Sequence, residues 1–308
     1  LNTAIKKRFN GGYFKMVKVG FEGVFQSQTS AFSLLKLDLE SQFSAVRVNL
    51  SNGQYQRLVA TLEGDLGISV GKDGVQQVLT NLNIKDGSML VAGYDRIDVP
   101  SGQLKSLMRD GKVKLEQLAL NLGSAGRFDL KGVIEMSNVG EVRDLKLFLN
   151  VPDMDAPLFS ALWPNWAAPK TRDWVISNVT KGRVRESKLS IAADLGAAEG
   201  VQKVYDIEGD VKVRDAHLTW SENADDLTNV DADLYWNNDE FSANILRGRM
   251  GRVSIQRSRV VIAPVLARVE KDALVTLNAK GDTRDVVDLA RQVELLQFDS
   301  FDLNKIEA

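Results

Sequence analysis

Apolar and polar residues alternate with a period of two along most of the chain. Four runs show the alternation most clearly: Val113, Leu115, Leu118, Leu120 and Leu122; Leu145, Leu147, Leu149 and Val151; Val230, Ala232, Leu234 and Trp236; and Phe241, Ala243 and Ile245. Because successive side chains of a strand point to opposite faces, each run predicts a strand with one apolar and one polar face. The pattern is typical of antiparallel sheet that is wetted on one side.

Turn sequences separate many of these runs. Asp73-Gly74, Asp86-Gly87 and Asp110-Gly111 are dipeptides favoured in β-hairpins, since glycine accepts the positive φ of a tight turn. Asn10-Gly11 and Asn52-Gly53 add two further turn signals. Turn signals repeated among alternating runs predict a meander of many strands.

One run changes parity in its middle. Val211 and Val213 share one parity, whereas Ala216 and Leu218 have the other, with Arg214-Asp215 between them. A β-bulge at these two residues would return all four apolar side chains to one face and bend the strand.

Two segments interrupt the alternation and predict short helices. Residues 152–174 hold four of the six prolines and three of the five tryptophans, and we expect helices near 158–180. Residues 283–293 place apolar side chains at helical spacing after Thr283, which predicts a second helical segment. The chain therefore divides into an N-terminal β-repeat segment (1–151), a Pro/Trp-rich helical joint (152–182) and a second β-rich segment with a C-terminal helix (183–308).

Composition removes several kinds of chemistry. The 308 residues include 39 Lys and Arg against 41 Asp and Glu, a near-neutral balance that weighs against nucleic-acid binding. The chain has no Cys, which excludes disulfides, thiolate metal sites and a cysteine nucleophile. It has one His, so a Ser-His-Asp triad would require His217. Because it begins at Leu1 and no stretch approaches the roughly 20 apolar residues of a membrane span, we expect a segment of a longer protein.

The polar residues fit a solvated sheet face better than a reactive site. Asp231 and Asp233 occupy the polar parity of an alternating run, although two carboxylates about 5–10 Å apart would suffice for a glycosidase. Asp225-Asp226 fits a turn, and a calcium loop would need more oxygen ligands at fixed spacing. His217 also lies on a polar parity. We predict no catalytic residue, no metal site and no cofactor, and hence no enzyme.

Two further features leave alternatives open. The basic stretch from Arg247 to Arg252 complements the acidic strands, although it also suits an anionic partner such as a lipid headgroup. Trp220 and Trp236 suit packing against the sheet, with a sugar-stacking platform as the alternative. No concentrated constellation of reactive groups emerges, whereas apolar strand faces are abundant and must be buried against something.

Six stretches resemble the central domain of the AsmA-like family of Gram-negative envelope proteins. They are Leu162-Trp163-Pro164, Arg172-Asp173-Trp174-Val175, Val179-Thr180-Lys181-Gly182-Arg183-Val184, Val204-Tyr205-Asp206-Ile207-Glu208-Gly209-Asp210-Val211, Leu227-Thr228-Asn229-Val230-Asp231-Ala232-Asp233-Leu234 and Met250-Gly251-Arg252-Val253-Ser254-Ile255. The resemblance covers roughly residues 140–290. It is a pattern of strands and turns and contains no catalytic motif.

The resemblance implies an elongated, curved antiparallel sheet that forms an open hydrophobic groove, described as a β-taco or repeating β-groove. It further implies a periplasmic protein, anchored in the inner membrane in its full-length form, that shields phospholipid acyl chains between the inner and outer membranes. Seven apolar residues from two neighbouring alternating runs are expected to line the groove: Val211, Val213, Leu218, Trp220, Ala232, Leu234 and Trp236. Two alternatives remain, a carbohydrate-active β-solenoid enzyme and a non-catalytic β-sandwich that binds a partner.

Overall fold

The structure is a computed structural model of the chain. It describes residues 9–26, 31–50, 55–91, 96–137, 141–164, 166–167, 169–196, 203–219, 225–263 and 272–292. The residues form two compact units, one of Leu1–Asn150 with Ser190–Val204 and one of Val151–Leu189 with Tyr205–Ala308. The second and shorter stretch of the first unit holds the end of one strand and the first residues of the next, and a third strand crosses the boundary after Asn150, so three strands contribute to both units.

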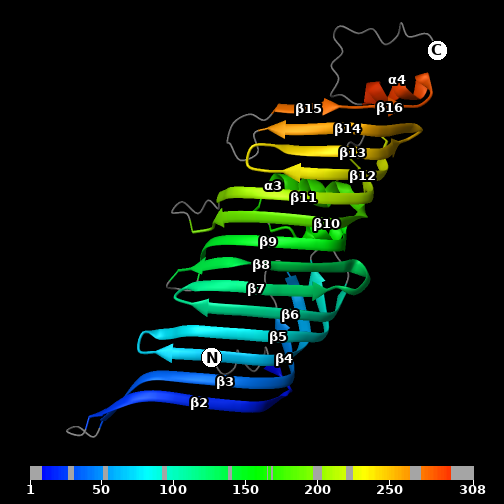
Figure 1. Cartoon of the computed structure of the whole chain (residues 1–308). Helices are drawn as coiled ribbons and strands as arrows, with labels where there is room; N and C mark the ends of the chain where they lie inside the picture. Colours follow the sequence, from blue (N-terminus) through cyan, green and yellow to red (C-terminus); the bar gives the residue numbers. More distant parts are fainter. Residues whose placement is uncertain are drawn as a thin grey trace. The chain divides into compact units, whose positions relative to one another are not determined.

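Antiparallel strands make up the first unit. They are β1 (Phe9–Asn10), β2 (Tyr13–Gln26), β3 (Ala31–Leu50), β4 (Tyr55–Gly71), β5 (Gly74–Val91), β6 (Ile97–Arg109), β7 (Lys112–Asn121), β8 (Gly126–Met136) and most of β9 (Val142–Asp155), with the short 3-10 helix η1 (Gly123–Ala125) before β8. From β2 to β9 each strand pairs with the next along the chain, and β1 lies beside β3. Figure 1 shows this succession of strands.

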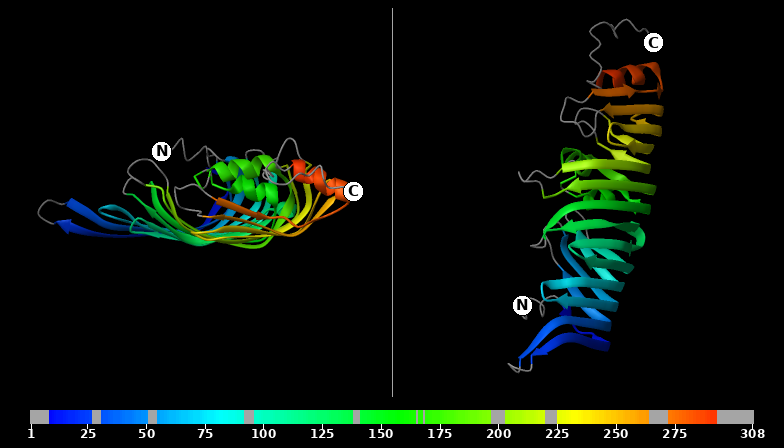
Figure 2. Two further views of the ribbon diagram at one scale, coloured as in Figure 1. Left: turned by 90° about the horizontal axis from the view of Figure 1, so that it is seen from above. Right: turned by 60° about the vertical axis from the view of Figure 1, so that its left-hand side comes forward.

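The second unit continues the same antiparallel arrangement and adds helices. Its elements are the end of β9, α2 (Ala156–Leu162), α3 (Pro169–Asn178), β10 (Val179–Asp194), β11 (Lys203–Leu218), β12 (Leu227–Trp236), β13 (Phe241–Met250), β14 (Val253–Ala263), β15 (Asp272–Thr276), β16 (Ala279–Lys280) and α4 (Thr283–Gln292). Neighbouring strands again follow each other in the sequence, and both β15 and β16 pair with β14. In each unit the ribbon of the sheet is curved (Figure 2).

The predicted fold class is confirmed. The chain is mainly β, its strands form an antiparallel sheet that does not close, and its helices are short. The interruption expected near 158–180 is formed by α2 and α3, and the one expected at 283–293 is formed by α4, whose last predicted residue lies outside the described part. Proline at the start of α2 fits because its missing N–H has no partner in a first helical turn.

The turn dipeptides were predicted with mixed success. Asp110-Gly111 joins β6 to β7 as expected, and Asp73 lies in the turn before β5. Asp86-Gly87 does not form a hairpin: it lies inside β5, where Asp86 has a φ of 48°. Asn10-Gly11 separates β1 from β2, yet both of these pair with β3, so it interrupts one edge rather than reversing the chain. Asn52-Gly53 lies outside the described residues.

Residues with left-handed backbone occur inside several strands and mark bulges. The bulge predicted at Arg214-Asp215 is confirmed, because the register of β11 against β12 shifts between Val213 and Ala216 and Asp215 has a φ of 51°. Ala45 in β3 and Asn229 in β12 have the same backbone conformation beside register shifts of their own. A bulge increases the local twist and bends its strand, which accounts for curvature within each unit.

The core of the second unit lies between its sheet and a helix. Leu289 and Val286 of α4 pack against a cluster of Met250, Val253 and Ile255. Figure 2 shows α2, α3 and α4 on the same, concave side of this unit's sheet. The amphipathic pattern of α4 therefore has a direct cause, since its apolar stripe covers apolar side chains of β13 and β14.

Candidate functional site

Rows of apolar side chains run across the strands of the first unit. The Val19 row consists of residues that lie directly opposite one another on seven consecutive strands: Val19, Leu39, Ile68, Val78, Met108, Val113 and Ile134. The Leu104 row crosses the same seven strands with Phe14, Phe43, Gly64, Leu82, Leu104, Leu118 and Leu130. Residues paired across strands share a face, so each row is a continuous apolar track perpendicular to the strands.

Both rows remain partly open to solvent. Their members within the sheet are half-buried, and the members on the outermost strand are more exposed, with Val19 at 58% and Phe14 at 67%. The fully buried apolar residues of this unit, such as Val91 and Val99, lie near the ends of β5 and β6. In the described part of the first unit η1 is the one helical element, so no helix described in this unit covers the two rows. Contiguous exposed apolar surface of this kind indicates a binding surface.

The opposite parity of the same strands is polar. A parallel row of directly paired residues there reads Gln42, Asp65, Asn81, Lys105 and Gln117. Exposed ion pairs flank it, with 2.6 Å between Lys85 Nζ and Glu63 Oε1 and 2.7 Å between Lys112 Nζ and Glu135 Oε1. The sheet of the first unit therefore has one apolar face and one hydrated face, as the alternation predicts.

The groove residues predicted from the sequence lie in the second unit. The structure pairs Val211 with Leu234 and Val213 with Ala232, directly across β11 and β12. Val213, Leu218 and Leu234 pack on a buried cluster that contains Ala232. Val211 and Ala232 are buried by the protein itself, whereas Val213, Leu218, Leu234 and Trp236 are half-buried. Trp220 lies outside the described residues. Their assignment to a groove stays a prediction.

Trp236 fills a space that a glycine leaves open. Gly209 lies directly opposite Trp236, and a Cβ added to Gly209 would lie 2.5 Å from the indole ring and 2.8 Å from Leu189. The indole also contacts Phe241, with 6.2 Å between the ring centres. Trp236 is therefore a packing residue of this face, and the sugar-stacking alternative gains no support from its surroundings.

The acidic residues of the second unit form ion pairs on its polar face. Arg247 lies between two carboxylates, with its Nε 2.6 Å from Asp231 and its Nη2 3.0 Å from Asp215. Burial would raise the pKa of Asp231, but hydrogen bonds from Arg247 and from the backbone N–H of Asp215 outweigh it and lower that pKa. Arg214 donates similarly to Asp233 at 2.7 Å. The first residue of the basic stretch thus complements acidic neighbours.

The single histidine lies at the end of this polar face. His217 Nε2 is 2.8 Å from Asp226 Oδ2, and hydrogen bonds from His217 and Thr219 lower the pKa of Asp226. Both side chains are part-exposed. The described residues contain no group of acidic and histidine side chains suited to a metal ion.

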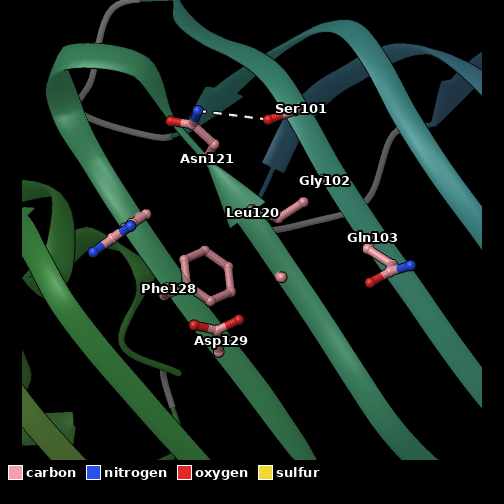
Figure 3. Close-up of a pocket in the computed structure, with 9 residues that line it drawn as sticks. Ser101, Gly102, Gln103, Leu120, Asn121, Phe128 and Asp129 are labelled. Carbon is pink, nitrogen blue, oxygen red and sulfur yellow. Dashed lines mark hydrogen bonds between the residues drawn. The ribbon is translucent and has the colours of Figure 1, made fainter.

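A shallow pocket of about 320 Å³ lies over β6, β7 and β8 (Figure 3). Its polar lining includes Asn121, whose amide lies 3.5 Å from the Ser101 hydroxyl, and Asp129. Gly102, Leu120 and Phe128 are direct cross-strand partners within the lining. A Cβ at Gly102 would lie 2.6 Å from Leu120, so glycine lets that leucine pack over the strand. The pocket has no nucleophile paired with a base.

Sequence reasoning missed the apolar rows of the first unit as a site. The alternation from Val113 to Leu122 predicts the strand β7, but it does not predict the cross-strand partners of its residues. Alternating residues in β3 and β4, such as Leu37 with Leu39 and Leu66 with Ile68, carry the same signal. What the sequence lacks is the register that joins them into rows.

No helix in the described residues is long and apolar enough to cross a bilayer. The chain matches no protein-family model, no curated protein and no solved structure.

Proposed function

We propose that the apolar face of the first unit binds the hydrocarbon chains of lipids and lets them move across the strands. With its resemblance to the AsmA-like family, the protein would serve phospholipid transport between the inner and outer membranes, within the periplasm. The observation that carries this proposal is the pair of apolar rows, each crossing seven strands and left uncovered by helices in the described part of that unit.

The dimensions of the rows suit an acyl chain. Neighbouring strands lie about 4.8 Å apart, so seven strands span about 29 Å. A bilayer's hydrocarbon core, which holds two acyl chains end to end, is about 30 Å thick. One acyl chain would therefore cover about half of a row, and the rest would be free for it to move into.

The energetics favour binding without a fixed position. A buried methylene contributes about 0.8 kcal/mol, so a chain of about 16 carbons shielded on one side gains on the order of 6 kcal/mol. This attraction has no preferred direction, because it depends on the apolar area removed from water. Neighbouring positions along the Val19 row, which is lined by aliphatic side chains of similar size, would differ little in energy.

Site-specific photocrosslinking tests the proposal. Benzoylphenylalanine at Leu104 should crosslink to phospholipid when the protein is incubated with vesicles of phosphatidylethanolamine and phosphatidylglycerol. The same group at Gln103, the next residue on the polar face, is the matched control and should not. Mass spectrometry of the crosslinked peptide identifies the adduct. Equal labelling at both positions, or none at Leu104, would refute the proposal.

A further inference from the structure

The outer edge of β2 differs from the edges that natural sheets normally leave open. Among the described residues β2 has β3 as its single strand neighbour, and it runs for 14 residues without proline. Its side chains include Val19 at 58% and Phe21 at 68% exposure. Exposed edge strands are usually short, charged or covered, because unpaired backbone groups recruit further strands. A long apolar edge therefore indicates a strand that is paired when the protein functions.

We propose that β2 pairs with β2 of a second copy of this chain, antiparallel and about a two-fold axis at Gly20. This register places Lys18 opposite Glu22 of the other copy, and it does so twice because of the symmetry. Val19 lies opposite Phe21, again twice, and Met16 lies opposite Val24. Around the axis, charged residues thus meet opposite charge and apolar residues meet apolar residues, whereas Lys15 lies opposite Phe25 nearer the ends of the strand.

Other registers of the same two strands lose this complementarity. A shift by one residue would place the apolar face of one copy beside the polar face of the other. An axis at Val19 would put Lys18 opposite Gly20, and an axis at Phe21 would put Glu22 opposite Gly20. Neither arrangement pairs the two charges. Lys18 forms an exposed ion pair with Glu40 at 3.6 Å, and its ammonium stays accessible to a second carboxylate.

The pairing would join two apolar faces into one. A two-fold axis perpendicular to the sheet keeps side chains of equal parity on the same face. The Val19 row of one copy would therefore continue into Phe21 of the other and from there into Leu37 and Val70, the successive partners of Phe21 across β3 and β4. The association itself does not depend on lipid, so it stands or falls separately from the proposed function.

A single cysteine at the axis tests the register. The chain has no cysteine, and a Cβ added to Gly20 would meet only Asp38 at 3.8 Å, an ordinary contact. Facing Cα atoms in antiparallel pairs are about 4.5–5.5 Å apart, within the range of a disulfide. Gly20→Cys should thus give a disulfide-linked dimer on mild oxidation. Lys15→Cys is the control, because its two copies would lie about 34 Å apart. Crosslinking that is absent at position 20, or equal at both positions, would overturn the proposal.

Charge reversal provides a second test that does not depend on disulfide chemistry. Lys18→Glu alone, or Glu22→Lys alone, places like charges opposite each other twice and should weaken the dimer by about tenfold or more in sedimentation equilibrium. An equimolar mixture of the two variants restores both opposite-charge pairs and should dimerise like the wild type. Wild-type protein that stays monomeric at high micromolar concentration, or a mixture that associates no better than its components, would contradict the pairing.

Discussion

Two aspartates on neighbouring strands of the Leu104 row are expected to weaken acyl-chain binding by about 50-fold. Leu104 and Leu118 lie directly opposite each other on β6 and β7, and both are half-buried. Each Leu→Asp change removes about three aliphatic carbon groups from the row. At about 0.8 kcal/mol for a fully buried group, and about half of that on an open face, two changes remove about 2.4 kcal/mol, and 1.4 kcal/mol corresponds to tenfold in affinity.

The assay is a fluorescence titration with cis-parinaric acid, a fatty acid that fluoresces in apolar surroundings. The matched control is Gln103→Asp with Gln117→Asp, which adds the same charge one residue away on the polar face and should change affinity less than about threefold. Because two aspartates opposite each other also destabilise a strand pair slightly, circular dichroism should establish that each variant is folded. A binding role for this face would be refuted if the wild type and the Leu104→Asp, Leu118→Asp double variant bound the fatty acid with equal affinity. It would also be refuted if the control variant lost as much affinity as the double variant.

Three further predictions concern stability. Gly64→Ala should lower the free energy of unfolding by about 1–3 kcal/mol, because Gly64 has a φ of 145° and a Cβ there would collide with the backbone of β5. Gly67→Ala is the control and should change it by less than about 0.5 kcal/mol, because a Cβ there would lie 3.6 Å from Leu79. Equal melting temperatures of the two variants would contradict this prediction. Ala232→Asp buries an unpaired carboxylate and should cost more than about 3 kcal/mol in urea unfolding, whereas Asp233→Ala breaks a part-exposed ion pair and should cost less than about 1 kcal/mol. Because the pKa of Asp231 is lowered in the folded protein, its carboxylate contributes stability that is present above pH 3.8 and lost as the pH falls below it. Asp231→Asn should therefore lose less resistance to urea unfolding between pH 5 and pH 2.5 than the wild type does. Parallel pH dependences of the two proteins would exclude this contribution.

The strands and their faces could be predicted from the sequence because the relevant signal is local. Alternation fixes which side chains share a face, and a bulge leaves a visible slip in parity, as between Val213 and Ala216. The same slip occurs between Leu115 and Leu118 of β7, where the structure shows a register shift against β8. In each case the apolar residues on either side of the slip remain together because burying them on one face lowers the free energy.

The meaning of Asp86-Gly87 could not be predicted, because the same dipeptide suits two structures. A positive φ at aspartate is compatible with a hairpin turn and equally with a bulge inside a strand. The choice depends on whether the partner strand continues past it, and β6 does so, with Gly87 opposite Val99. Long-range pairing of this kind is absent from the local pattern.

The candidate site could not be predicted in full either, because it depends on long-range strand pairing. Alternation placed Val211, Val213, Ala232 and Leu234 on one face, and the structure pairs them as two adjacent couples. It did not reveal that helices lie on the concave side of that unit, nor that the first unit has rows that no helix among its described residues covers. The antiparallel pairing of consecutive strands also differs from the parallel coils that a β-solenoid enzyme would require.

Within each unit, a strand bonds mainly to the strands that precede and follow it in the chain, and this has a consequence for how such a protein changes over time. Loss or duplication of one hairpin alters only the contacts on either side of it, so the remainder keeps its geometry. Each such event shortens or extends an apolar row by two strand spacings, or about 10 Å. The length of an apolar row can therefore change in small steps. Stability should grow with the number of hairpins, because it does not depend on one central core.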